Sequence, residues 1–381
     1  MVAVLFWVCA GLLVYTQVGY ALALAALAAL ARVRRPRPLP ASAAAPPPLV
    51  SLIVAAHAEQ GAIAAKVADA LALDWPRERL ELIVACDGSP DATARLAREA
   101  GADLVLELPR VGKVAAQAAA VARSRGELLA FSDANARWER DALRELAAPF
   151  ADPRVGYACG QVCFVPAGPG AAAANQEGLY WRYEMALRTL ESRLSSVTAG
   201  NGAIYAVRRD AYLAAGTPLS HDLALPSAVV KLGLRAVYAP GALATEAMVP
   251  TLAGERARKR RMASQAWEIV LRGGLLDPRG YPPLYALMIA SHRVLRYAAP
   301  FLHVAALGLN AALLGDGWVY VATFALQVAA LAGALVAPAI RARPLLVARY
   351  YVATNASVAI GLLDYLTRGA PVAWEPAEGA R

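Results

Sequence analysis

Long apolar stretches lie on either side of a more mixed central region. Val2 to Ala31 are almost wholly apolar, interrupted mainly by Thr16 and Gln17, and a membrane-spanning helix needs about 20 such residues. No basic residue precedes this run, but four arginines follow it within 32–37, which is not the order of a cleaved signal peptide. We therefore interpret 1–31 as an uncleaved transmembrane anchor. The positive-inside rule then puts the residues that follow in the cytoplasm.

The central region, 49–272, follows a Pro/Ala-rich linker at 32–48 and alternates strand-like apolar runs with helical stretches. The runs predict five strands at Val50–Ala55, Leu80–Ala85, Asp103–Glu107, Glu127–Phe131 and Val155–Val165. Alternation of this kind is typical of an α/β domain built on a mostly parallel sheet. Ligands of such sheets bind beyond the carboxyl ends of the strands.

The last part of the chain is again apolar. We divide it into an interfacial helix region, two or three transmembrane helices and a tail: 273–297, 298–366 and 367–381. Within these, Tyr281–Tyr297 carries basic residues among apolar ones, as expected of a helix at a membrane surface. Ala298–Leu314 and Trp318–Ala339 are long enough to span. Leu345–Leu366 contains Arg349, Asn355 and Asp364, so it is either a third span, a re-entrant segment or a helix packed on the interface.

Composition and charge agree with membrane attachment. Hydrophobic residues make up 58% of the chain and charged residues 18%, against roughly half and a quarter in soluble proteins. The net charge is +9, but no basic-aromatic stripe or nucleic-acid motif accompanies it, so we expect no nucleic-acid partner. Anionic lipid headgroups or a diphosphate would suit this charge better. The four cysteines have neither zinc-ligand spacing nor a disulfide framework.

Polar residues follow three of the predicted strands. His57 and Glu59 follow the first strand, Asp87 the second and Asp133 the fourth. Because the carboxyl ends of parallel strands meet at one edge of a sheet, we expect these side chains to face a common crevice. Asp87 alone is equally consistent with a strand-to-helix turn in which Asp91 caps the helix.

Two further segments suggest a site for phosphate and metal. Lys113 opens a helix-like run, where the helix amino terminus favours a phosphate, although a solvated lysine is the plainer reading. Asp133 and Asn135 present oxygens at i and i+2, which can together hold a hard divalent ion such as Mg²⁺ or Mn²⁺. A turn or a helix cap would use the same residues.

The carboxyl half of the central region offers a general base and a basic cluster. Asp222 precedes a helix-like run and is either a base or the helix cap, and its neighbour His221 either assists a metal or faces solvent. Glu255–Arg261 holds five basic residues in seven. Arg258 and Arg261 could clamp a diphosphate, or the run could be a solvated helix face.

Taken in this order, the residues resemble family 2 glycosyltransferases with the GT-A fold. The nearest branch is the membrane-attached one that includes cellulose, chitin, hyaluronan and poly-N-acetylglucosamine synthases, and the resemblance runs from the first strand to Trp374. The chain departs from the family pattern at Asn135, which replaces a second Asp, and at His221, which replaces an acidic residue. Of the Gln-x-x-Arg-Trp signature at 258–262 it keeps only Arg261.

The resemblance implies a role for each motif. It assigns the nucleotide-sugar to His57, Glu59, Asp87, Lys113, Asp133, Arg258 and Arg261. It assigns the metal to Asp133, Asn135 and His221, the acceptor to Gly200, Asn201 and Gly202, and the catalytic base to Asp222. Asp87, Asp133 and Asp222 should therefore converge on one pocket.

The sequence thus predicts a multi-pass inner-membrane protein with a cytoplasmic catalytic domain. It would transfer a sugar with inversion, from a nucleotide-diphosphate sugar (a UDP-sugar in the favoured case) to a polysaccharide or glycan acceptor. One alternative is a lipid glycosyltransferase acting on a polyprenyl phosphate, ceramide or diacylglycerol. Another is a scaffold subunit that binds nucleotide-sugar without turnover. Few spans and the interfacial helix favour the first alternative, whereas the Asp133/Asp222 pair argues against the second.

Overall fold

The computed structural model describes residues 1–31, 46–165, 174–216, 219–247, 252–340 and 342–370. Most of the predicted linker lies outside the described residues, as does the tail from 371 onward with Trp374.

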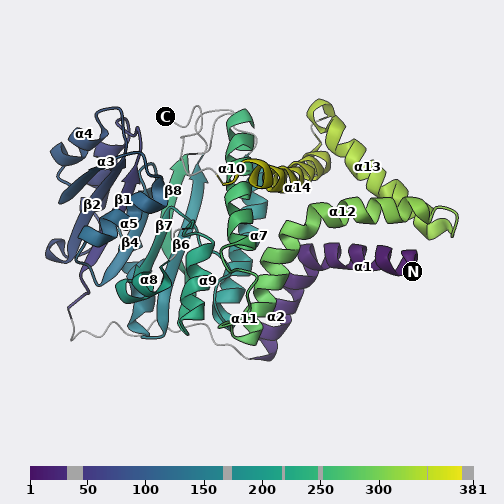
Figure 1. Cartoon of the computed structure of the whole chain (residues 1–381), viewed down its shortest axis with the longest axis horizontal. Coiled ribbons are helices and arrows are strands. Elements are labelled where there is room, and N and C mark those ends of the chain that lie inside the picture. The colour runs from purple at the N-terminus through teal and green to yellow at the C-terminus, as the bar shows by residue number, and fades with distance from the viewer. Residues whose placement is uncertain (32–45, 166–173, 217–218, 248–251, 341, 371–381) are drawn as a thin grey trace.

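A single mixed sheet forms the centre of the domain (Figure 1). Its eight strands are β1 (Val50–Ala56), β2 (Leu80–Asp87), β3 (Leu104–Leu108), β4 (Leu128–Asp133), β5 (Arg137–Trp138), β6 (Val155–Val165), β7 (Ile204–Arg208) and β8 (Arg235–Ala247). They lie in the order β3-β2-β1-β4-β7-β6-β8-β5. β1 pairs in parallel with β2 and β4, β2 with β3, and β6 with β8. β7 runs antiparallel to β4 and β6, and β5 antiparallel to β8. The five predicted strands are confirmed to within two residues; β5, β7 and β8 were not predicted.

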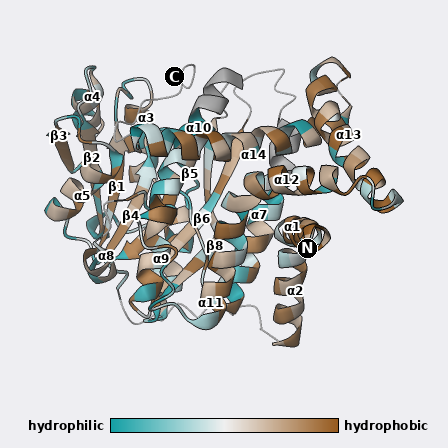
Figure 2. Ribbon diagram, turned by 45° about the vertical axis from the view of Figure 1, so that its right-hand side comes forward, coloured by the Kyte–Doolittle hydropathy of each residue, from teal (hydrophilic) through white to brown (hydrophobic). Residues whose placement is uncertain are grey.

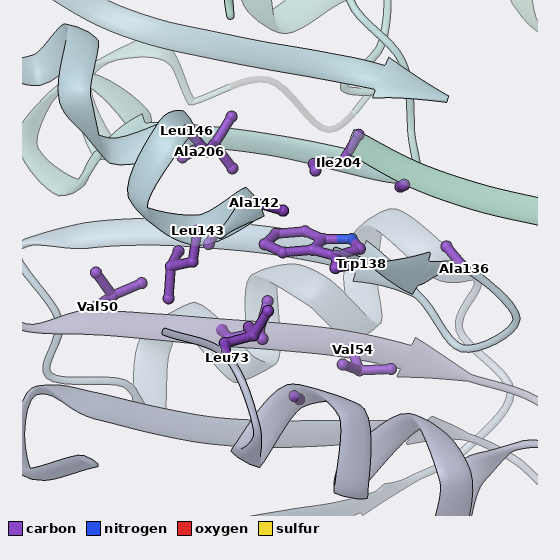
Figure 3. Close-up of a cluster of buried hydrophobic side chains, with 14 of the residues drawn as sticks. Val50, Val54, Leu73, Ala136, Trp138, Ala142, Leu143, Leu146, Ile204 and Ala206 are labelled. Carbon is purple, nitrogen blue, oxygen red and sulfur yellow. The ribbon is translucent and has the colours of Figure 1, made fainter. Parts of the chain in front are cut away.

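Helices cover both faces of the sheet. They are α3 (Ile63–Leu71), α4 (Thr93–Glu99), α5 (Lys113–Arg123), α6 (Ala142–Ala147), α7 (Ala174–Leu194), α8 (Arg209–Ala215), α9 (Ala224–Lys231) and α10 (Leu252–Leu271), with short 3₁₀ turns at Arg77–Arg79 and Ala148–Ala151. Side chains alternate between the two faces of a strand, so Leu52 packs toward α3, α4 and α6 while Ile53 packs toward α5, α9 and α10. Trp138 lies in the first of these layers, among Leu143, Ile204 and Val54 (Figure 3).

Helix α3 shows how this first layer is built. Ile63, Val67 and Ala70 are spaced one helical turn apart and are fully or almost fully buried against the sheet. Lys66 occupies the i+3 position of the same stripe and is only 3% exposed. A charged side chain is rare in such a place unless it is paired.

Six further helices of the described chain pack beside the sheet or project from it. They are α1 (Val2–Val14), which continues through a π-helical turn (Tyr15–Gly19) into α2 (Tyr20–Leu30), then α11 (Pro283–Met288), which continues through a π-helical turn (Ile289–Val294) into α12 (Leu295–Ala312), and finally α13 (Trp318–Ile340) and α14 (Arg343–Arg368). Three helical segments are long and apolar enough to cross a membrane: Val2–Leu30, Trp318–Ile340 and Arg343–Arg368. Figure 2 shows α1, α2 and α13 as predominantly hydrophobic ribbons.

The expected span at 298–314 lies mostly in α12, which is 18 residues long but is not among the three described helices that are apolar enough to cross a membrane, whereas α14 is. Of the polar residues that made α14 a poor span, Asp364 has a partner in the central domain, whereas Asn355 donates to the carbonyl oxygen of Tyr351 in α14 itself. Asp364 forms an ion pair with Arg260 of α10. The two helices cross closely, because a Cβ added to Gly361 would lie 2.5 Å from the Cβ of Ala263.

The predicted interfacial helix is α11 continued into α12, and its basic residues point into protein. His292 and Arg293 are buried, and Arg296 forms an ion pair with Glu184 of α7. His292 Nδ1 lies 2.6 Å from Glu191 Oε1. Tyr20 of α2 donates a hydrogen bond of 2.6 Å to the same carboxylate oxygen. These side chains therefore contribute to the contact of this segment with α2 and α7.

Glu191 is the shared acceptor of this cluster. Burial by itself raises the pKa of Glu191, but His292 and Arg293 outweigh it, so the pKa lies below its usual value. Glu191 also accepts hydrogen bonds from the backbone N–H (3.0 Å) and the hydroxyl of Thr198. The cluster joins α2, α7, α12 and the segment before β7.

We predict that Glu191→Ala lowers the free energy of unfolding by about 3–5 kcal/mol, because His292 and Arg293 would keep their burial and lose their counter-charge. Chemical denaturation of the full chain in detergent measures this. The stabilisation should be complete above pH of about 4.3, the unfolded-state pKa, and should be lost as pH falls through the lower folded-state pKa.

Glu99→Ala is the matched control, since Glu99 pairs with Arg95 on the exposed surface of α4 and should contribute less than about 1 kcal/mol. Equal losses in the two variants would contradict a special role for the buried cluster.

Candidate active site

The ends of β1 and β2 are tied together at one edge of the sheet. His57, just after β1, places its Nδ1 2.7 Å from the backbone oxygen of Asp87 at the end of β2. The next residues cross-link the same loops, since the N–H of Ala58 donates to Ser89 Oγ (3.1 Å) and that of Glu59 to Thr93 Oγ1 (2.8 Å). Ala58 has a left-handed backbone with φ 54°, which fixes a sharp turn at this point.

Asp87 organises the loop that precedes α5. Its side chain is fully buried and accepts hydrogen bonds from the backbone N–H groups of Val111 (2.6 Å) and Gly112 (3.0 Å). Arg110 lies 3.6 Å from the same carboxylate. Gly112 has φ 90°, a conformation that L residues rarely adopt. Asp87 is the residue expected to contact the nucleotide. By holding Gly112 it also sets the position of Lys113, the residue that follows Gly112 and begins α5.

Lys113 bridges two predicted motifs. Its ammonium forms an ion pair with Asp133 at the end of β4 and lies 3.4 Å from the carbonyl oxygen of Gly202. The phosphate candidate, the metal candidate and the acceptor loop therefore meet at one point. Asn135, two residues after Asp133, is exposed.

The acceptor loop is fixed from several sides. Gly200 donates its N–H to the backbone oxygen of Asp222 (2.7 Å), and its own carbonyl accepts a bond of 2.6 Å from Arg188 of α7. Asn201 is buried and uses its side chain on the backbone of Gly160, Ala203 and Ile204. Asn201, predicted to bind acceptor, thus shapes the loop through its side chain.

Asp222 lies next to this loop and half-buried. Its Oδ1 accepts a hydrogen bond of 2.6 Å from the Ser220 hydroxyl. Burial raises the pKa of Tyr205 well above its usual value, and the carboxylates of Asp133 and Asp222 both raise it further. Asp87 is connected to Asp133 through Gly112 and Lys113, whereas Asp222 is connected to the same region through the backbone of Gly200.

His221 lies in the aromatic layer behind the loop. Its Nδ1 is 2.7 Å from the Tyr205 hydroxyl, and its ring meets Phe131 and Tyr212 edge-on. Burial, with a smaller contribution from Lys113, lowers the pKa of His221 to about 3, so it is neutral. This setting favours a packing role over the predicted metal ligand. Within the described residues, no three His, Cys, Asp or Glu side chains gather as a metal cluster.

The basic run of α10 divides between two neighbours. Arg258 lies over the ring of Phe164 on β6, 5.9 Å from its centroid, whereas Lys259 lies over Tyr350 of α14 at 4.3 Å. Phe164 is the β6 partner of Glu246 on β8. Arg258 therefore faces the sheet, as a diphosphate clamp would need. Arg261 is partly buried on the same helix.

Two residues of the site were not predicted. Lys66 donates to Ser132 Oγ and to the carbonyl oxygen of Ala136, both at 2.6 Å, and burial lowers its pKa to about 7 against the opposing effect of Asp133. Burial, with a smaller contribution from Asp133, raises the pKa of Glu246 to about 7. Neither residue stands in a recognisable motif, although a lysine inside the apolar stripe of α3 was a signal in a chain with four lysines.

Comparison with known proteins agrees with this geometry. Residues 51–213 match the model of glycosyl transferase family 2. Two curated N-acetylglucosaminyltransferases are similar: one from Rhizobium meliloti (strain 1021), 29% identical over 54% of this chain and 53% of its own length, and one from Rhizobium sp. (strain N33), 26% identical over 56% and 51%. The chain thus spans about half the length of these relatives.

A solved structure is similar over almost the whole chain. It is a mannosyltransferase from Pyrobaculum calidifontis, in complex with GDP-Man and Mn²⁺, with a TM-score of 0.71 and 23% identity. The match covers 95% of this chain and 99% of that one. The two proteins therefore share a fold, including the helices outside the sheet.

We predict that Gly200→Ala distorts the loop, because the added Cβ would overlap the hydroxyl of Tyr157 and lie 2.9 Å from its Cζ. Overpacking of this kind costs about 1–3 kcal/mol, and we expect a matching fall in thermal stability together with weaker activity. Among the described residues the buried Tyr157 hydroxyl has no hydrogen-bond partner, so Tyr157→Phe alone should be tolerated.

The double variant Tyr157→Phe/Gly200→Ala tests the cause, since it removes the oxygen that the Cβ meets. Partial recovery of stability relative to Gly200→Ala is expected. A double variant no more stable than Gly200→Ala would contradict the clash.

Proposed function

We propose that this chain, of which residues 51–213 match the family 2 glycosyl transferase model, moves a sugar from a nucleoside-diphosphate sugar to a glycan hydroxyl at the membrane, in one inverting displacement. The observation that carries this proposal is the meeting of Lys113, Asp133 and the 200–202 loop, with Asp222 bonded to that loop. A charged pair for the donor thus lies beside the acceptor loop, to which Asp222 is joined through its backbone oxygen.

Each step has a residue to perform it. Asp222 would take the proton of the acceptor hydroxyl, whose oxygen then attacks the anomeric carbon from the side opposite the leaving diphosphate. Lys113 and Arg258 would lie along the diphosphate and offset its growing negative charge. His57, Glu59 and Asp87 hold the loops between which the nucleoside would bind.

The residues fit a divalent ion of the Mg²⁺ or Mn²⁺ kind. Asp133 already faces a cation, Lys113, and exposed Asn135 adds a neutral oxygen two residues on. Such ions commonly bind through one or two protein ligands and complete their shell with substrate phosphates, so a larger protein cluster is not required. When bound, the ion would supply positive charge to the departing diphosphate.

The donor and the orientation also belong to this proposal. The two curated relatives are N-acetylglucosaminyltransferases, which supports a UDP-N-acetylhexosamine as the first donor to test. The four arginines between 32 and 37 support a cytoplasmic catalytic domain held by the apolar helices at both ends.

A lipid acceptor is the second candidate. The described part of the chain has three helices able to cross a membrane, which is few for a channel that passes a growing polymer. Met262 also stands where processive synthases of the resembling branch have a tryptophan. Product labelled from a radioactive donor would enter organic solvent if the acceptor is a lipid, and would form a size ladder if it is a growing glycan.

We predict that Asp222→Asn lowers kcat by about 10²-fold or more with nucleotide affinity retained, because the proton acceptor is lost. Release of nucleoside diphosphate from a panel of donors, measured in membranes with and without chelator, provides the assay. Chelator should abolish release.

Asp210→Asn is the matched control, since Asp210 is exposed on α8 and bonds only to the neighbouring Ala211 N–H in the described structure. Near-parental turnover of Asp222→Asn with the true acceptor would show that Asp222 is not the base.

A further inference from the structure

The buried side chain of Lys66 contacts the candidate metal-binding turn, residues 132–136. It belongs to α3, a helix that carries none of the residues assigned above to donor, acceptor or metal. Its amine donates to Ser132 Oγ and to the carbonyl oxygen of Ala136, each at 2.6 Å. These two atoms stand immediately before and after Asp133-Ala134-Asn135. Lys66 therefore fastens both ends of the segment that would hold a divalent ion.

The surroundings of Lys66 extend this contact to the acceptor side. Its Nζ lies 5.4 Å from the centroid of the Trp138 ring, within range of a cation–π contact. The indole N–H of Trp138 donates to the carbonyl oxygen of Ala203 (3.0 Å), next to Gly202. A single side chain thus contacts the metal turn and the residue that supports the acceptor loop.

The position is costly for a lysine on stability grounds alone. Its neighbours on α3 are Ile63, Val67 and Ala70, and Figure 3 shows the apolar side chains that surround Trp138 in the same layer. A methionine would fill this space without the cost of burying an amine. The two short hydrogen bonds are what the amine adds, and both go to the turn.

Glu246 of β8 lies near the end of the turn. β5 and β8 pair in antiparallel register with Arg137 opposite Thr245, so Glu246 follows on from that pair beside Ala136. The turn is therefore bonded to the amine of Lys66 at both ends, and the residues that follow it pair with β8.

We propose that Lys66 is a positioning residue that holds Asp133 and Asn135 in the geometry needed for a divalent ion and the donor diphosphate. The inference rests on the metal site of the proposed function. The alternative roles of Lys66 predict different results. A purely electrostatic role would oppose cation binding, so removing the amine would tighten it. A purely structural role would change stability and leave the metal affinity of the folded protein unaltered.

The test is calorimetric titration of Mn²⁺ into the full chain in detergent, saturated with UDP, with UDP alone as the blank. We expect Lys66→Met to weaken Mn²⁺ affinity by about 10–100-fold, the usual effect of losing a group that orients metal ligands. Ser132→Ala removes one of the two anchors with no change of charge, and we expect a smaller loss in the same direction.

Lys231→Met is the matched control. Lys231 is the last residue of α9, whereas Asp222 lies just before the first. Like Lys66, Lys231 donates to a carbonyl oxygen, that of Gly274 (2.8 Å), and lies over an aromatic ring, that of Tyr281. It should bind Mn²⁺ as the parent does. The proposal is overturned if Lys66→Met binds Mn²⁺ as tightly as the parent or more tightly. If Lys66→Met does not fold, unchanged affinity in Ser132→Ala overturns it.

Asp133→Asn separates this inference from the proposed function. Loss of Mn²⁺ binding in Asp133→Asn with parental binding in Lys66→Met would refute the role of Lys66 alone. Parental binding in Asp133→Asn would instead refute the metal site itself.

Discussion

The backbone from Thr198 to Gly202 is the point on which the arrangement of the molecule depends. On one side, the backbone N–H of Thr198 donates to the carboxylate of Glu191. The same carboxylate contacts Tyr20 of α2 and His292, which lies in the π-helical turn before α12. On the other side, Gly200 bonds to Asp222, and the carbonyl of Gly202 lies near Lys113. Burying these charges costs desolvation free energy, so their pairing does less for net stability than for uniqueness of geometry. The segment therefore fixes the position of the outer helices relative to the sheet.

The active edge of the sheet shows a balance of charge across chain-distant elements. Asp133 from β4 and Glu246 from β8 supply negative charge, while Lys113 from α5 and Lys66 from α3 supply positive charge. Burial lowers the pKa of Lys66 and raises that of Glu246, and the charge of Asp133 raises the pKa of both. A diphosphate and a divalent ion would enter this balance as a nearly matched pair of opposite charges.

Sequence patterns predicted the parts of the fold that repeat locally. The first four strands and their terminal His57, Asp87 and Asp133 follow from apolar runs ended by polar residues, and parallel pairing brings such ends together. Sequence patterns did not predict the antiparallel β7 or the long β8. The partner of β7 is β4 and that of β8 is β6, and both partners are far away in the chain. The same holds for Lys66 and Glu246, whose importance arises only from tertiary contact.

The outer helices illustrate the limit of composition as a guide. Arg293 and Asp364 resembled interfacial or disfavoured membrane residues, yet one is buried beside Thr198 and the other pairs with Arg260. A charged residue in an apolar helix gives the same sequence pattern whether its partner is a lipid headgroup, water or a second helix. Only the position of α7 and α10 decides between them.

The π-helical turn at Tyr15–Gly19 has a geometric consequence for membrane attachment. The Tyr183 hydroxyl holds the carbonyl oxygen of Gln17 at 2.7 Å, and the two arms of the helix diverge there (Figure 1). A straight helix over Val2–Leu30 would measure about 43 Å, whereas the 13-residue arm α1 measures about 20 Å, less than the roughly 30 Å of a hydrocarbon core. Hydrophobic thickness, and not hydropathy, thus becomes the quantity that sets how deeply this end of the molecule can enter a bilayer.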